Sequence, residues 1–164
     1  MAKPRFISGV DWSPPFPWPT HTALPIPFPL MGRRVMLVAD EDVARQGQEL
    51  PSFLWVVDIT DETHPMPFAS FQVDGVDGSP TRDFSGCHQP VEDVRGTEIP
   101  VAWFAQGLRI VDIKNQHAPR EVASFMPPTP EGSDRVSSND VFVDGRGLIY
   151  LIDRKRGLHI LERA

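Results

Sequence analysis

An internal repeat is the sequence feature that most constrains how this chain can fold. The segment Leu54–Phe71 aligns without a gap with Leu108–Phe125, and eight of the eighteen aligned residues are identical. The identical pairs are Leu54/Leu108, Val57/Val111, Asp58/Asp112, Ile59/Ile113, Pro65/Pro119, Ala69/Ala123, Ser70/Ser124 and Phe71/Phe125. A third copy begins at Gly157, where GLHILE matches the GLRIVD that starts at Gly107. Because self-similarity at a fixed period is typical of repeat architectures, we expect stacked copies of one structural unit.

Each copy contains short apolar runs that indicate β-strands. Apolar runs from Val35, Val101 and Leu148 precede the repeated segments, and the three units open further upstream at His21, His88 and Asn139. Proline and glycine separate these runs, as they do at the turns between strands. Four antiparallel strands that recur about every 50 residues are typical of a β-propeller blade. The sequence therefore predicts an all-β fold, a partial β-propeller with about three four-stranded antiparallel blades.

The pattern GLRIVDI…APREV, followed by RGLIYLIDRKRGLHILE, resembles the LVIVD-repeat family over about residues 21–162. The resemblance implies a propeller fold but no particular chemistry. On this alignment the blades span about residues 21–86, 87–138 and 139–164, and the last unit lacks its fourth run. A closed propeller takes about 4–8 blades. The chain thus resembles either the carboxy-terminal portion of a larger propeller or a protomer that completes a ring by assembly. We expect missing blades or another subunit as partners.

A proline-rich segment precedes the repeats. Seven of the 18 prolines fall between Pro14 and Pro29. Proline removes a backbone donor and breaks helices, so this segment should be extended or irregular. Phe16 and Trp18 make it too apolar for a solvated linker. We therefore predict that residues 1–20 form an ordered N-terminal arm.

Composition and charge exclude several classes of function. Sixteen basic and 22 acidic residues give a net charge of −6 and a pI of about 5.3, whereas binding to nucleic acid or to an anionic membrane needs a basic face. No run approaches the ~18 apolar residues of a membrane-spanning helix, and residues 1–30 lack the layout of a signal peptide. The single cysteine, Cys87, cannot form an internal disulfide. These features do not indicate a cellular compartment.

Two recurrent aspartates have a structural interpretation. Asp58 and Asp112 end their runs just before turns that close at Pro65 and Pro119. A carboxylate at such a position can accept hydrogen bonds from the turn N–H groups. Recurrence once per unit is typical of a scaffold feature, and Glu162 takes the place in the last copy. We therefore predict a structural turn role for both aspartates and assign no catalytic residue.

The histidines that open the first two units are candidate metal ligands. His21 and His88 begin first strands, which line the central channel of a propeller, and Asn139 holds this channel-lining position in the third unit. Zinc and copper favour imidazole nitrogen, so imidazoles around one axis could share an ion. The alternative is that each side chain bonds the backbone of a neighbouring blade. Copper-dependent methanethiol oxidases of the selenium-binding-protein type also have channel histidines, which is a likeness of fold alone.

Two functions follow from these observations, and both stay open at this point. The first is a binding or scaffold module whose channel mouth or loops bind a protein or a small molecule. The second is a copper- or zinc-dependent enzyme, such as an oxidase, with its ion near His21 and His88. A catalytic metal needs about three protein ligands and an open position. The run Asp40–Asp42 opens a loop that is longer than in the later units, which is a reasonable place for contact with a partner or a cation.

Overall fold

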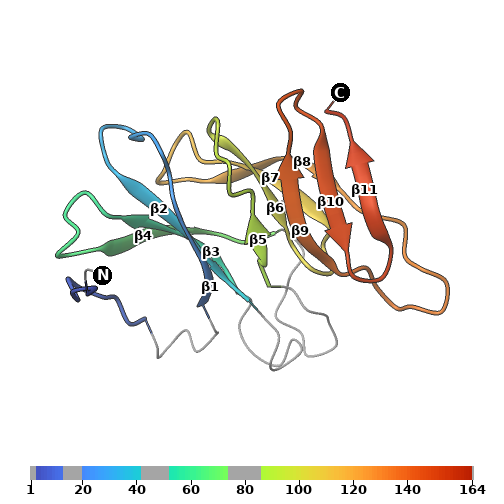
Figure 1. The fold of residues 1–164 in the computed structure, drawn as a ribbon, viewed down its shortest axis with the longest axis horizontal. Helices are drawn as coiled ribbons and strands as arrows, with labels where there is room; N and C mark the ends of the chain where they lie inside the picture. The colour runs from blue at the N-terminus through green and yellow to red at the C-terminus, as the bar shows by residue number, and fades with distance from the viewer. Residues whose placement is uncertain (1–2, 13–19, 42–51, 74–85, 164) are drawn as a thin grey trace.

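The computed structural model describes residues 3–12, 20–41, 52–73 and 86–163. These residues form eleven strands in three antiparallel sheets, and no helix occurs among them (Figure 1). Accordingly, the described part of the chain has no helical segment able to cross a membrane. The all-β prediction is confirmed.

The strands follow the chain from sheet to sheet. The first sheet contains β1 (Thr20–Pro25), β2 (Val35–Asp40), β3 (Leu54–Asp58) and β4 (Met66–Phe71) in that order. The second contains β5 (Gln89–Pro90), β6 (Glu98–Ala102), β7 (Leu108–Asp112) and β8 (Arg120–Phe125). The third contains β9 (Ser138–Val143), β10 (Ile149–Asp153) and β11 (Gly157–Leu161). Each strand pairs with its neighbour in sequence, so every sheet is a simple meander.

The repeated segments form strand pairs with the same register. Leu54 pairs with Phe71 in the first sheet, and Leu108 pairs with Phe125 in the second. Both ladders contain a register shift at the same place, between the third and fourth residues of β3 and of β7. A bulge inserts one extra residue and bends its strand. The sequence repeat therefore extends to the details of pairing.

The central strands are covered on both faces. In β2 and β6 nearly every residue is buried, as expected for strands that lie between packed layers. Phe71 of the first sheet meets Trp103, which follows β6, in an edge-to-face contact with ring centroids 5.6 Å apart. Phe104, the next residue, is fully buried, whereas Phe125 on the outer strand β8 is only half-buried. The core thus lies between the sheets and thins toward the outer strands.

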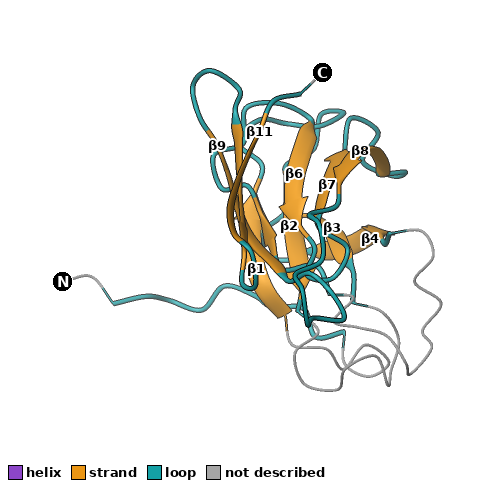
Figure 2. Ribbon diagram, turned by 90° about the vertical axis from the view of Figure 1, so that its right-hand side faces the viewer, coloured by secondary structure: helices purple, strands orange, loops and turns teal. Residues whose placement is uncertain are grey.

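The described part of the N-terminal arm contacts the first sheet through Ser8 and Trp12. The Trp12 ring stacks on Trp55 of β3, with centroids 5.6 Å apart. The Ser8 hydroxyl donates to the main-chain oxygen of Glu62. Residues 3–12 otherwise extend away from the sheets (Figure 2). Phe16 and Trp18 lie outside the described residues, as do Asp42 and the loop it opens.

Candidate metal centre

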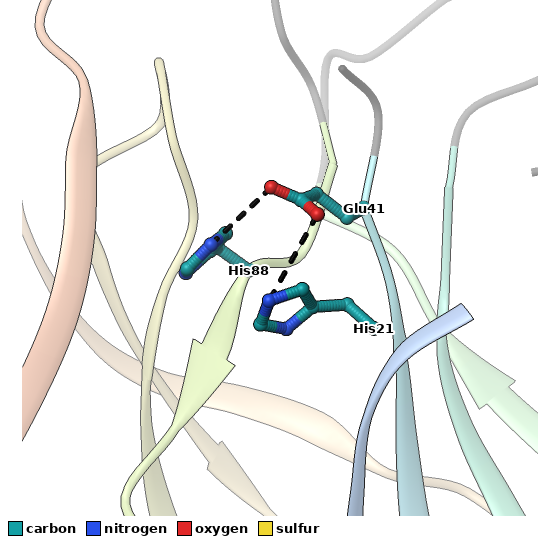
Figure 3. Close-up of side chains that lie close together, drawn as sticks. All are labelled: His21, Glu41 and His88. Carbon is teal, nitrogen blue, oxygen red and sulfur yellow. Dashed lines mark ion pairs between the residues drawn. The ribbon is translucent and has the colours of Figure 1, made fainter. Parts of the chain in front are cut away.

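Three side chains from two sheets converge at the candidate site (Figure 3). They are His21, Glu41 and His88, and one ligand atom of each lies within 4.8 Å of those of the other two. His21 belongs to β1 and Glu41 directly follows β2, its paired neighbour. His88 precedes β5, and its amide donates to the carbonyl oxygen of Ala102 in β6 at 3.0 Å. The cluster therefore joins the first sheet to the second.

The carboxylate of Glu41 faces both imidazoles from one side. Its Oε1 is 3.3 Å from Nε2 of His88, and its Oε2 is 3.9 Å from Nε2 of His21 (Figure 3). The ring centroids of the two histidines are 4.4 Å apart. Both rings thus present the same nitrogen to one carboxylate.

A main-chain contact orients His88. Its Nδ1 bonds the carbonyl oxygen of Asn139 in β9. Since a carbonyl oxygen only accepts, Nδ1 carries the proton and the Nε2 lone pair is directed toward Glu41. His88 is only 7% exposed, and the Phe104 ring packs against its imidazole with centroids 4.8 Å apart. The ring is therefore held by packing as well as by the hydrogen bond.

A chain of hydrogen bonds assigns the same tautomer to His21. Its Nδ1 lies 2.7 Å from the Thr22 hydroxyl, which donates to Oε1 of Gln89 at 3.1 Å. The Gln89 amide nitrogen donates to the carbonyl oxygen of Pro90, which fixes the orientation of the amide. Because the Thr22 proton is used toward Gln89, its oxygen accepts from Nδ1–H of His21. Nε2 of His21 therefore also faces Glu41.

The surroundings keep His88 neutral near pH 7. Burial lowers the pKa of His88 below 6.5, and the nearby His21 and Arg154 act in the same direction. The bond to Asn139 and the charge of Glu41 oppose the shift but do not cancel it. Neutral imidazole is the form that binds a metal. The site therefore holds a ligand-competent His88 at physiological pH.

Two imidazole nitrogens and a carboxylate are a ligand set that metal proteins use. His₂Glu sites hold zinc in hydrolytic enzymes, and two histidines with one carboxylate also hold iron. Ligand atoms about 2.0–2.1 Å from a tetrahedral ion lie about 3.3 Å from one another. Nε2 of His88 lies 3.3 Å from Oε1 of Glu41 and Nε2 of His21 lies 3.9 Å from Oε2, and one ligand atom of each residue lies within 4.8 Å of the others. The side chains must therefore move closer together to hold one ion.

The structure brings together both histidines that the sequence singled out. The predicted alternative, a bond to a neighbouring backbone, also occurs at His88, because one ring nitrogen faces Asn139 and the other faces Glu41. Asn139 thus takes part through its main chain, while its side-chain Oδ1 is buried without a hydrogen-bond partner. Sequence reasoning missed Glu41 as a ligand. Its only signal was its place in the acidic run that opens a long loop.

The two recurrent aspartates lie in turns away from this cluster. Asp58 Oδ1 accepts from the amide of Thr60 at 2.8 Å, and Asp112 Oδ1 accepts from the amide of Lys114 at 2.9 Å. The Thr60 side chain, followed by its amide, lowers the pKa of Asp58, and the Lys114 amide contributes most to the lowered pKa of Asp112. Asp58 also pairs with Arg33, which lies between β1 and β2, and Asp112 pairs with Arg120 of β8. Their contacts belong to the turns.

Neither protein-family models nor curated proteins give a match to this chain. The likeness to LVIVD repeats therefore rests on the quoted residues alone.

Proposed function

We propose that this chain binds one divalent metal ion through His21, Glu41 and His88, within a propeller-type arrangement of its three sheets. One observation carries the proposal, namely that Nε2 atoms of two histidines converge on a single carboxylate. Three acceptors that face one another need a positive charge between them. A proton on His88 could supply that charge, but the lowered pKa of His88 disfavours it. A metal cation satisfies all three groups at once.

Zinc fits the donor set best. It takes imidazole nitrogen and carboxylate oxygen in three-ligand sites of the His₂Glu type. Copper(II) also accepts nitrogen and oxygen donors, so copper is the competing ion. Among the described residues the cluster contains no thiolate or thioether, which are the ligands that favour copper(I).

The number of ligands suggests a reactive or exchangeable ion. Structural zinc sites have four protein ligands, whereas catalytic sites have three and leave one position for water or substrate. The His21 side chain is 35% exposed, so a small molecule can approach the cluster from its side. A zinc ion there would polarise a bound water or carbonyl group. We therefore favour metal-dependent chemistry on a small ligand over a purely structural ion.

A scaffold function without metal is the second candidate. It is supported by the identical pairing registers of β3–β4 and β7–β8, since equivalent units stacked side by side are what a repeat scaffold contains. In an LVIVD-type propeller the three sheets would be blades, and their first strands would surround a common axis. Such a scaffold would bind a protein or small-molecule ligand at the channel mouth.

Metal titration of the chelator-treated chain tests the first candidate. We expect wild type to bind one equivalent of zinc, measured by calorimetry and elemental analysis. Glu41→Gln and His88→Gln should each weaken binding by at least about 100-fold, because even outer-shell partners contribute about 10–100-fold. His64→Gln is the matched control, because His64 is exposed and pairs with one carboxylate only, that of Asp61 at 3.0 Å.

The outcomes separate the two candidates. If wild type binds neither zinc nor copper, the metal function is wrong and the scaffold stands. If all three variants bind as tightly as wild type, the ion sits elsewhere and the proposed site is wrong. Tighter binding of copper than of zinc would reverse the choice of ion but keep the site.

A further inference from the structure

The third sheet exposes large apolar side chains on one face. Phe142 lies opposite Tyr150, and Tyr150 lies opposite Ile160, so the three side chains share a face. Ile152 and Leu158 form the next row of the same face. Four of these residues, Phe142, Ile152, Leu158 and Ile160, are between 42% and 59% exposed; together they are called the outer face below. An apolar patch of this kind marks an interaction surface.

The equivalent face of the second sheet is covered. Leu158 and Ile160 correspond in the repeat to Leu108 and Ile110, which are 1% and 5% exposed. Leu108 and Ile110 line a cavity together with Ile149 of the third sheet, so they face the sheet that follows them in the chain; Ile160, on the edge strand β11, also borders this cavity. The outer face is thus the position at which a further sheet would pack.

The edge of the third sheet is open as well. In the first two sheets the third strand pairs with a fourth, β3 with β4 and β7 with β8. Their counterpart β11 pairs only with β10 among the described residues. Unpaired edges accept an added strand through main-chain hydrogen bonds.

The N-terminal arm carries the sequence pattern of a fourth strand. Residues 3–9 read KPRFISG, and the segment around β8 reads APREVAS from Ala118. Pro4, Arg5 and Ile7 fall on Pro119, Arg120 and Val122. The end of β8, Phe125, corresponds to Val10; twelve residues separate Phe125 from β9, and nine separate Val10 from β1. The arm therefore resembles a fourth strand in pattern, with a shorter connection to the strand that follows.

The arm is exposed and far from the edge that it matches. Phe6 is 84% exposed and Ile7 is 55% exposed. The N-terminus and β11 lie at opposite ends of the long axis of the molecule (Figure 1). The arm is anchored to the first sheet through Ser8 and Trp12, so it cannot reach its own β11 without leaving these contacts. A second copy is the molecule that can present β11 to it.

We propose that two copies associate head to tail, and that residues 3–8 of each copy add to β11 of the other as its fourth strand. The outer face of each third sheet then packs against the first sheet of the other copy. Two copies supply six sheets, within the about 4–8 blades of closed propellers. The inference rests on the propeller arrangement proposed above, and it does not depend on the metal.

A charged pair gives the proposed contact a register. In the second sheet Asp112 lies opposite Arg120, and their side chains approach to 3.5 Å. The repeat places Glu162 at the position of Asp112, and the arm places Arg5 at that of Arg120. Arg5 of one copy should therefore pair with Glu162 of the other, once at each of the two junctions.

Molar mass in solution tests the association. Light scattering on the eluting protein should give twice the 18.4 kDa chain mass for wild type. Ile7→Asp and Phe142→Asp should each give monomer, because each places a charge in an apolar contact of the proposed interface. Met126→Asp is the control, since Met126 is an exposed apolar residue beside the second sheet and outside the proposed contact. A wild type that is monomeric up to about 100 µM overturns the proposal, whatever the result of the metal titration.

A charge exchange tests the segment and its register. Arg5→Glu and Glu162→Arg should each raise the dimer dissociation constant at least fivefold, because each dimer contains the pair twice. The double variant should return to within about twofold of wild type, measured by sedimentation. A dimer that none of these changes weakens, or whose single variants the double variant does not rescue, excludes strand addition by the arm. Loss of metal binding with an intact dimer would reject the metal function alone.

Discussion

Nδ1 of His88 bonds the main-chain oxygen of Asn139, 51 positions further along the chain and in another sheet. This contact fixes the tautomer of His88 and so directs its Nε2 toward Glu41 of the first sheet. The geometry of the candidate site therefore depends on all three sheets. A change in how the sheets pack should alter metal affinity even when no ligand is substituted.

His88 should make the metal-free protein less stable as the pH drops below about 6.5. The pKa of His88 is lowered in the folded state, mainly by burial, so the unfolded chain binds more protons in this window. Protons therefore favour unfolding, and metal affinity should fall in the same direction because protons compete for Nε2. Urea unfolding at pH 7.5 and 5.5 measures the effect. From pH 7.5 to pH 5.5, the free energy of unfolding should fall less in His88→Gln than in wild type. An equal change in the two proteins would contradict the assignment.

Asp40 should make the free energy of unfolding depend on pH in the opposite direction, at lower pH than His88. Burial raises the pKa of Asp40 to about 6, although hydrogen bonds from Trp55 and Thr20 act against the shift. The folded state then binds more protons between pH 4 and 6, so this contribution to stability is lost as the pH rises through 6. Asp40→Asn keeps an oxygen for Trp55 and should gain up to about 3 kcal/mol at pH 7.5, at 1.36 kcal/mol per pKa unit.

The measurement is the difference in unfolding free energy between wild type and Asp40→Asn at pH 4 and at pH 7.5. The two proteins should lie closer together at pH 4, where Asp40 is protonated in the folded state. A difference that does not vary with pH would show that Asp40 does not titrate in this range.

The strand pairs were predictable because they depend on local pattern. The segment from Leu54 and that from Leu108 carry the same apolar positions and the same turn aspartate, and this is enough to give both the same register. The approach of His21 to His88 was predictable for a similar reason, since both open the first strands of neighbouring units.

The third member of the cluster, Glu41, was not predictable from pattern. Asp40 and Glu41 are adjacent acids, and the end of β2 decides which of them faces the site. Asp40, paired with Thr20, is buried and bonds Trp55, which leaves Glu41 to turn toward the histidines. Asn139 shows the same limit. Its place at the start of the third unit could be predicted, but its contact with His88 through the main-chain oxygen rather than the side chain could not.

Replacing Asp112 should cost stability and leave metal binding intact. Asp112→Ala removes the acceptor for the Lys114 amide and should cost about 1–3 kcal/mol, the range for a polar group that loses its partner. Asp112→Asn keeps an oxygen at the same place and should recover part of the loss. Thermal unfolding and zinc titration of both variants are the measurements. An Asp112→Ala protein of normal stability that fails to bind zinc would give this aspartate a functional role.

Two glycines at equivalent positions of the repeat should respond differently to substitution. Gly107 and Gly157 have φ of +75° and +82°, so alanine is strained at both, by about 1 kcal/mol or more. At Gly107 a Cβ would also lie 2.4 Å from the carbonyl oxygen of Phe125, whereas at Gly157 it meets nothing within 4 Å. The oxygen belongs to the fourth strand of its sheet, so Gly107→Ala must displace β8 and Gly157→Ala need not. We expect Gly107→Ala to be destabilised by at least 2 kcal/mol more than Gly157→Ala in dilute monomer. Equal losses in chemical unfolding would mean that β8 does not pack against β7 as tightly as the structure places it.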